Sequence, residues 1–315
     1  MLSDRNAMKK TVLSILFIVF TFCILKYPKI SLYYALTGID LWYQKMLPTL
    51  VPFMILSGIL IRLNLSDIIG RLFSRIPFAL FSVSKNAVYV ICIGFLCGFP
   101  MGAKLVADLY LRKKISKAEG EYLLSFCNNI GPVYFVSYVL PLIQRKMLLP
   151  YLFGMYGLPL IYGWFLRYTT YRKYDLKKDS IRLLSEGQSK IYSIPEAVDE
   201  SIRASMISIY MLCGYMILFN LCNLIPHLMF GGFTVYLAPF FEISSGIAFL
   251  RDKCPIYTLL LLPFGGLSCL AQTYSCIRDT GFQITRYLGH KIVLTILTGI
   301  YYLGWFFLFP ASFLR

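Results

Sequence analysis

Two glycine-rich stretches interrupt long apolar runs in this chain of 315 residues, and both contain polar side chains that could bind a solute. They are Cys97–Lys104 and Gly265–Gln272. Each interruption leaves helical legs of about ten residues, whereas a helix needs about twenty to cross a hydrocarbon core. Non-helical backbone is tolerated at that depth only where protein or a water-filled cavity surrounds it. Two interrupted segments in matching positions of two halves are typical of a transporter's substrate site.

The candidate substrate-binding residues are small or polar and lie at or near such breaks. A helix that follows a break presents unpaired backbone N–H groups and a partial positive charge, which suit carboxylates. We therefore expect the tips 98–103 and 265–269 to meet near the membrane midplane around a small anion. The candidates are Gly98, Pro100, Gly102, Lys104, Asn128, Asn129, Glu242, Ser244, Ser245, Gly266, Ser268 and Gln272.

Several of these side chains also have a structural interpretation. Glu242 lies in an apolar run, where a carboxylate costs about 2.5–3.5 kcal/mol, so it either works in the site or pairs with Lys104. Lys104 either meets the anion or extends its ammonium to the cytoplasmic face. Asn128 and Asn129 precede Gly131-Pro132, and their amides can bond to a ligand or to backbone groups that the proline leaves free.

The composition is that of a membrane protein. Hydrophobic residues make up 58% and charged residues 15%, with a mean hydropathy of +0.66, which excludes an ordinary soluble domain. The net charge of +16 could indicate nucleic acid, but the basic residues cluster between apolar runs as topology signals do, so we expect no nucleic-acid partner.

The residues indicate neither an enzyme nor a cofactor. The nine cysteines and two histidines form no Cys-x-x-Cys pair or other metal-ligand spacing. No Ser-His-Asp or paired-carboxylate arrangement appears, so we expect no catalytic residue and no metal. The sequence leaves open whether a proton or a cation is coupled to transport.

The apolar runs predict a single all-α polytopic membrane domain, with about eight transmembrane helices plus two re-entrant hairpins in an inverted repeat. A first helix over 11–27 lacks a small-residue cleavage site, which favours a retained helix over a signal peptide. The polar stretch 167–195 is expected in the cytoplasm and separates repeat one, about 38–166, from repeat two, about 196–310. The remaining runs are Leu41–Leu63, Ala87–Leu111, Tyr122–Ile143, Met147–Leu166, Ile202–Leu224, Leu228–Leu250, Ile256–Ile277 and Leu288–Phe309.

The distribution of positive charge favours the first hairpin. If Ala87–Leu111 crossed fully, the basic cluster Arg112–Lys117 would lie outside, against the positive-inside bias. A turn at Gly98–Gly102 keeps this cluster in the cytoplasm with the 167–195 loop. In the second half we expect a hairpin that turns at Gly265, with Gln272 matching Lys104, and a last helix that returns Arg315 to the cytoplasm.

Four stretches resemble the signature sequences of the YlbJ/SpoVV sporulation membrane proteins, which belong to the nucleoside-recognition Gate group and are similar to concentrative nucleoside transporters. Their order and approximate spacing match over most of the chain. The chain departs from the family pattern in its shorter length and at Ser244-Ser245, where a Glu-x-Thr-x-Gly pattern is expected. The stretches are Gly98–Lys104, Phe126–Pro132, Phe241–Gly246 and Phe264–Ser268.

This resemblance implies a sporulating bacterium and export of dipicolinate across the outer forespore membrane. Dipicolinate carries two carboxylates on a pyridine ring, so amide donors, Lys104 and aromatic side chains would suit it. We therefore expect a multi-pass transporter in the cell membrane, with the lipid bilayer and a small anion as its partners. A nucleoside permease and a non-transporting membrane subunit remain alternatives, and the sequence does not indicate the oligomeric state.

Overall fold

The computed structural model describes residues 2–73, 81–143, 149–186 and 192–309, and this part of the chain contains helices and loops without a strand. Lys85–Cys97 and Pro132–Leu142 are short apolar helices. Five segments of the described part are long and apolar enough to cross a membrane: Pro28–Arg62, Leu149–Tyr168, Ile194–Phe241, Pro255–Ile277 and Ile284–Leu308. The chain is an all-helical, polytopic membrane protein, as predicted.

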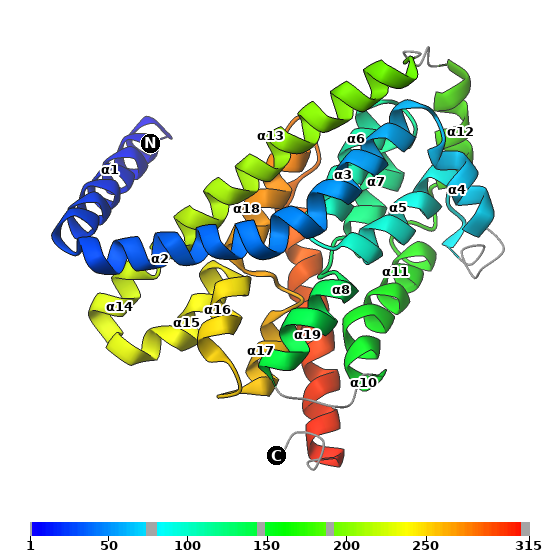
Figure 1. Cartoon of the computed structure of the whole chain (residues 1–315). Coiled ribbons are helices and arrows are strands. Elements are labelled where there is room, and N and C mark those ends of the chain that lie inside the picture. Colours follow the sequence, from blue (N-terminus) through cyan, green and yellow to red (C-terminus); the bar gives the residue numbers. More distant parts are fainter. Residues whose placement is uncertain (1, 74–80, 144–148, 187–191, 310–315) are drawn as a thin grey trace.

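The first half contains a long helix, a hairpin, a broken helix and a final helix (Figure 1). Its elements are α1 (Leu2–Lys26), α2 (Pro28–Leu41), η1 (Trp42–Met46), α3 (Leu47–Arg62), α4 (Ser66–Phe73), α5 (Lys85–Cys97), α6 (Met101–Leu111), α7 (Lys117–Leu124), α8 (Pro132–Tyr134), η3 (Phe135–Val139), α9 (Leu140–Leu142), α10 (Leu149–Leu152), η4 (Phe153–Gly157) and α11 (Leu158–Tyr168).

The second half follows α12 (Leu176–Glu186), which lies in the polar segment between the halves. It is joined to the first half mainly along its long first helix, α13, which lies beside α2 and α3 (Figure 1). Its elements are α13 (Ile194–Leu221), α14 (Leu224–Phe230), η5 (Gly231–Phe233), α15 (Thr234–Phe241), α16 (Ile243–Leu250), α17 (Pro255–Leu261), α18 (Gly266–Ile277) and α19 (Ile284–Leu308).

α5 and α6 form the predicted hairpin at Gly98. The two helices pack against each other. Their close approach depends on glycine, because a Cβ built on Gly94 would lie 3.2 Å from the Cα of Gly102. Gly98 has a φ of +80°, a conformation that favours glycine and lets the chain reverse between the two helices.

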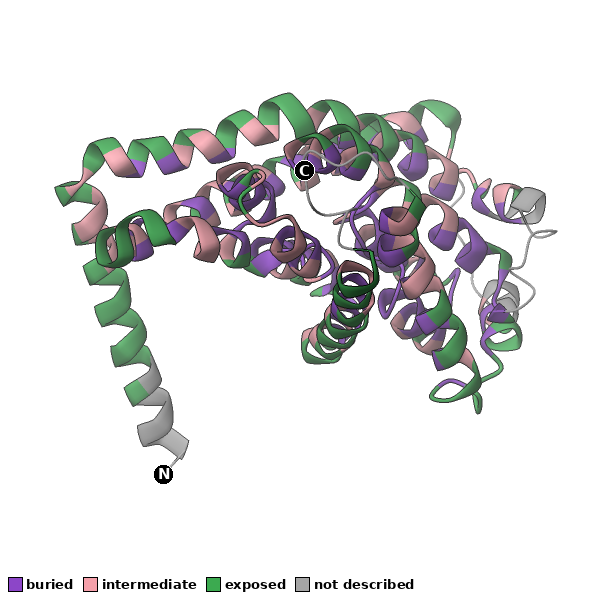
Figure 2. Cartoon of the chain, turned by 90° about the horizontal axis from the view of Figure 1, so that it is seen from below, coloured by how far each residue is buried: buried purple, intermediate pink, exposed green. Residues whose placement is uncertain are grey.

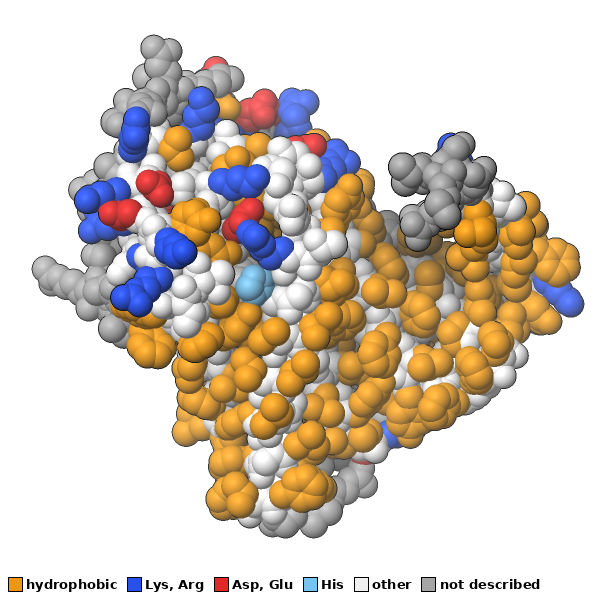
Figure 3. Space-filling view, turned by 180° about the vertical axis from the view of Figure 1, so that it is seen from behind, with side chains coloured by type: hydrophobic (Ala, Val, Ile, Leu, Met, Phe, Trp, Pro, Cys, Tyr) orange, Lys and Arg blue, Asp and Glu red, His pale blue; other side chains and the backbone are white. Residues whose placement is uncertain are grey.

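The segments that follow α6 and α11 meet at one end of the molecule, as the charge distribution predicts. The backbone N–H of Ser116 donates to Ser180 Oγ at 2.9 Å, and this hydroxyl donates to the Glu119 carboxylate at 2.5 Å. Ser84, at the start of α5, donates to the same carboxylate through its N–H and its hydroxyl, at 2.7 and 2.9 Å. Figure 3 shows charged side chains gathered in this region, which we call the basic end.

The second hairpin turns at Glu242, so the prediction of a hairpin at Gly265 is wrong. α15 and α16 lie side by side (Figure 1), and a Cβ built on Gly246 would lie only 2.3 Å from the Pro239 nitrogen. α17 and α18 do not pack along each other in this way. Gly265 and Gly266, with φ of +78° and +76°, break the helix without reversing it, and Pro255–Ile277 forms one candidate span.

The direction of the last helix is also opposite to the prediction. Arg286, near the start of α19, pairs with Glu121 on α7 at the basic end. Tyr301 and Tyr302, near its other end, donate to the backbone oxygens of Pro150 and Tyr151 at 3.1 and 2.7 Å. α19 therefore starts at the basic end and runs away from it. The preceding segment, Pro255–Ile277, runs toward the basic end. Arg315 lies outside the described residues.

Much of the outer surface is hydrophobic below the basic end (Figure 3). α1 is exposed over most of its described length (Figure 2), and α19 exposes a row of aliphatic side chains, among them Ile292, Ile296, Ile300 and Leu303. Continuous apolar surface of this extent would be unfavourable in water and suits the acyl chains of a bilayer.

Candidate functional site

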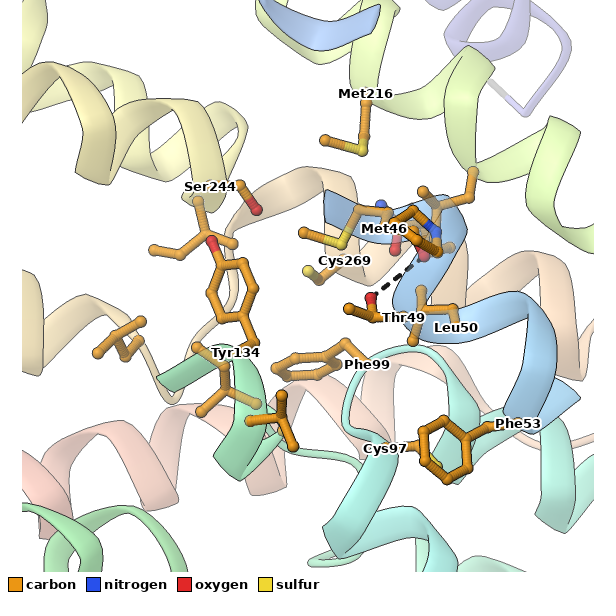
Figure 4. Close-up of a pocket in the computed structure, with 18 of the residues that line it drawn as sticks. Met46, Thr49, Leu50, Phe53, Cys97, Phe99, Tyr134, Met216, Ser244 and Cys269 are labelled. Atoms are coloured by element: carbon orange, nitrogen blue, oxygen red, sulfur yellow. Dashed lines mark hydrogen bonds between the residues drawn. The ribbon is translucent and has the colours of Figure 1, made fainter. Parts of the chain in front are cut away.

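A cavity of about 300 Å³ lies where both hairpin tips and both helix breaks come together with α3 and α13 (Figure 4). Its lining combines apolar and aromatic side chains with a few polar groups. Three of the predicted candidates, Glu242, Ser244 and Gln272, line it. The other lining residues include Met46, Thr49, Leu50, Phe53, Cys97, Phe99, Tyr134, Met216 and Cys269.

Glycines hold the tip of the first hairpin directly on the break that precedes α8. A Cβ built on Gly98 would lie 2.2 Å from the Gly131 nitrogen, and one on Gly102 would lie 2.4 Å from the Cys127 carbonyl oxygen. A Cβ on Gly131 would lie 2.7 Å from the Cys97 oxygen. The two motifs 98–104 and 126–132 are therefore one packing unit, in which Pro100 stands immediately before α6.

The second hairpin is held on the break at Gly265 in the same manner. A Cβ built on Gly266 would lie 2.8 Å from the Pro239 carbonyl oxygen and 3.4 Å from the Ile243 nitrogen. A Cβ on Gly265 would lie 3.1 Å from the ring of Phe99, so the unit of the second half also contacts the first tip. The tips at Gly98 and Glu242 thus each pack on a helix break, at Gly131 and Gly265 respectively.

Glu242 breaks the apolar run and begins the next helix. It is buried, with 2% of its surface exposed, and its backbone is extended at φ −138° and ψ 117°. Its two carboxylate oxygens accept hydrogen bonds from the N–H groups of Ser244 and Ser245 at 3.1 and 2.7 Å. These bonds satisfy two free donors at the start of α16, where a negative charge is also favoured by the helix dipole.

Lys104 is not the partner of Glu242. Its ammonium lies 3.4 Å from the Asp108 carboxylate, one turn further along α6, and Lys104 is not part of the cavity wall. Gln272 does not occupy a position equivalent to that of Lys104. Its side chain lines the cavity, and its amide donates to Ser268 Oγ at 2.9 Å. The expected contact between Lys104 and a bound anion has no support in this geometry.

Asn128 joins the break in the first half to helices of both halves. Its side-chain oxygen accepts from the Ala103 N–H at 3.3 Å. Its amide nitrogen donates to Thr273 Oγ1 on α18 at 3.0 Å and to the Tyr287 hydroxyl on α19 at 2.9 Å. All of these partners belong to the protein, so the Asn128 side chain organises the site.

Lys291 is a central residue that the sequence analysis did not identify. It is 1% exposed and donates to the Asn128 backbone oxygen and, at 2.9 Å, to Asn129 Oδ1. Its ammonium lies 4.5 Å from the centroid of the Phe99 ring. In the sequence, Lys291 stands near the start of the run Leu288–Phe309, where a lysine normally marks the membrane interface. The signal that could have identified it is its place one residue after His290 and just before an uninterrupted aliphatic stretch, Ile292–Leu294.

Comparison with known proteins yields one relevant relative. The chain is 24% identical over 330 aligned positions to the protein described as "Sporulation integral membrane protein YlbJ" of Bacillus subtilis (strain 168), covering 90% of this chain and 79% of the relative. No family model matches the chain, and no solved structure matches it. The similarity covers most of the chain, as the resemblance of the motifs predicts. The comparison thus confirms the resemblance of this chain to the YlbJ sporulation integral membrane proteins.

Proposed function

We propose that this chain is a transporter that moves a small organic anion, dipicolinate, across the outer forespore membrane during sporulation. The observation that carries the proposal is the cavity at which two hairpin tips meet two helix breaks. Irregular backbone at membrane depth suits a site that admits a polar solute. Broken helices from two halves around one site are the arrangement expected of secondary transporters.

An inverted repeat accounts for the order of the elements in the proposed transporter. Each half has a long helix, a hairpin, a broken helix and a final helix, and the glycine contacts at Gly98 and Gly266 place each hairpin tip on its own break. The α5–α6 hairpin returns to the basic end, whereas α15–α16 enters from the opposite end. Both hairpins are re-entrant in this proposal, and alternating access comes from movement of one repeat against the other.

The size and lining of the cavity favour a small ring over a nucleoside. A volume of about 300 Å³ is at the lower limit of small-molecule sites, which span about 300–1,000 Å³. Tyr134 and Phe53 supply aromatic surface. A nucleoside permease would need amide and carboxylate groups for the ribose hydroxyls, but Glu242 and Asn128 already bind the protein's own groups.

Deletion of the gene in the organism that encodes this chain tests the proposed function. We expect the mother cell to synthesise dipicolinate at the normal level. The spore core should contain much less dipicolinate than in the wild type. Growth on uridine as sole nucleoside source should not change. Normal spore dipicolinate in the deletion strain, measured by terbium fluorescence, would contradict the proposal, and a selective defect in uridine use would favour the permease.

A further inference from the structure

No carboxylate of the described residues forms an ion pair with Lys291. The side chain is fully buried, and the ion pairs of the described residues do not include it. Its acceptors, the Asn128 backbone oxygen and Asn129 Oδ1, are neutral. They replace part of the hydration of the amino group but supply no negative charge, so its protonated form is costly away from water.

The ammonium lies directly behind one wall of the cavity. Phe99 is the shared residue, because its ring lines the cavity and also lies 4.5 Å from Lys291 Nζ. Figure 4 shows this ring projecting among Tyr134, Leu50 and Cys269. Phe99 is partly exposed and follows Gly98, at the tip of the hairpin. The Phe99 ring thus stands between the cavity and the ammonium.

We propose that Lys291 is the anion-binding group of the cavity and that Phe99 shields it when no anion is present. This inference rests on the proposed function and names its substrate class, a small carboxylate. The cation–π contact with Phe99 is exchanged for a charge-assisted hydrogen bond from Nζ to the carboxylate. Asn129 continues to hold the ammonium from the other side.

The position of Lys291 also connects anion binding with the contact between the two halves of the molecule. Lys291 belongs to α19 in the second half, whereas its acceptors belong to the break that supports the first hairpin tip. A carboxylate on Nζ would replace the contact of the ammonium with Phe99, which belongs to the first half. Anion binding would then weaken a contact between the two halves at the moment when transport requires them to move.

The test is binding of dipicolinate to the purified full-length protein in nanodiscs, compared with pyridine-2,6-dicarboxamide, a neutral molecule of the same shape. The variants are Lys291→Gln and, as a matched control, Lys104→Gln, which removes a lysine paired with Asp108 outside the cavity. We expect the wild type and Lys104→Gln to bind the dicarboxylate and not the diamide. Lys291→Gln should bind it about ten- to a hundredfold more weakly, the range of a charged hydrogen bond.

A second variant, Phe99→Leu, keeps the test decisive if Lys291→Gln does not fold. Removal of the ring should leave the ammonium open and strengthen dicarboxylate binding. Unchanged binding in Lys291→Gln, or unchanged binding in Phe99→Leu, would overturn the role of Lys291 and leave the transport proposal intact. If the folded wild type binds no dicarboxylate, the proposed function itself fails.

Discussion

Single polar residues of the site act first on the protein's own backbone. Glu242 begins α16 by accepting from two N–H groups, and Asn128 links the first break to α18 and α19. Such bonds are needed because unpaired backbone groups at membrane depth are costly. From the sequence, Glu242 and Asn128 are polar residues that an apolar run must have a reason to keep. The sequence does not indicate whether that reason is a ligand or the backbone.

The residues that the sequence misjudged share a physical cause. Lys104 is a candidate because it follows the tip of the first hairpin, yet its ammonium forms an ion pair with Asp108, one helical turn away. Lys291 was not considered because a lysine near the start of an apolar run normally marks the interface. The position of each helix in the bundle decides which basic residue is buried. For Lys291 this position is set by the packing of α19 against α11, α17 and α18.

Glu242→Gln tests the assignment of Glu242 to the start of α16. A glutamine keeps the size of the side chain but retains only one acceptor oxygen, so we expect a loss of about 1–2 kcal/mol in unfolding free energy. Unfolding in mixed detergent micelles can measure this loss. Because Glu242 and Lys104 do not touch, the double variant with Lys104→Gln should be additive within about 0.5 kcal/mol. A larger coupling energy would indicate that Glu242 and Lys104 do form an ion pair.

At the scale of elements, each hairpin tip is held on a helix break by glycine. Glycine motifs in the sequence predicted the first hairpin, since the basic cluster at Arg112–Lys117 required the chain to return. They misplaced the second, because Gly265-Gly266 resembles a turn and Glu242 does not. A glycine of positive φ permits a reversal but does not require one, and only the packing of α15 on α16 distinguishes the two cases.

Gly102→Ala should separate the first tip from its break. The added methyl group would lie 2.4 Å from the Cys127 carbonyl oxygen, so we expect a loss of about 1–3 kcal/mol in stability and a loss of transport. Gly289→Ala is the matched control, since Gly289 lies in α19 with nothing within 4 Å of its Cβ position. That change should be neutral or stabilise the helix by up to about 1 kcal/mol. Equal thermal stability of the two variants would contradict the packing role of Gly102.

Glu119 makes the junction at the basic end sensitive to pH. Burial raises the pKa of its carboxyl group from 4.5 to about 7, although hydrogen bonds from Ser180 and Ser84 oppose this shift. The folded state therefore binds the proton more tightly than the unfolded state, and stability falls as pH rises from about 4.5 to about 7, by up to about 1.4 kcal/mol per pH unit. Thermal unfolding at pH 5 to 8 should show this decline, and Glu119→Gln should flatten it. An unchanged pH profile in the variant would assign the decline to other groups.

For the whole molecule, the halves are arranged so that their irregular segments share one cavity while their hydrophobic faces point outward. The two halves meet along α2, α3 and α13 and again through the bonds of Asn128 and Lys291. The overall membrane character follows from composition alone. The direction of the last helices does not follow from composition. An error in the position of one hairpin reverses the predicted direction of every later segment.

Accessibility of single cysteines tests this direction. Lys117→Cys and Lys178→Cys, in a background without the nine native cysteines, should be labelled by an impermeant maleimide from the same side. Leu308→Cys, at the exposed end of α19, should be labelled from the opposite side. Labelling of all three from one side would mean that Pro255–Ile277 does not cross the membrane.

The most direct test of transport is uptake of labelled dipicolinate into proteoliposomes that contain the purified protein. We expect saturable uptake that exceeds uptake into empty liposomes and is not competed by uridine. Uptake should be lost in Gly102→Ala and retained in Gly289→Ala. Uptake equal to that of empty liposomes, with the protein inserted and folded, would contradict a transport function and leave the role of a non-transporting membrane subunit.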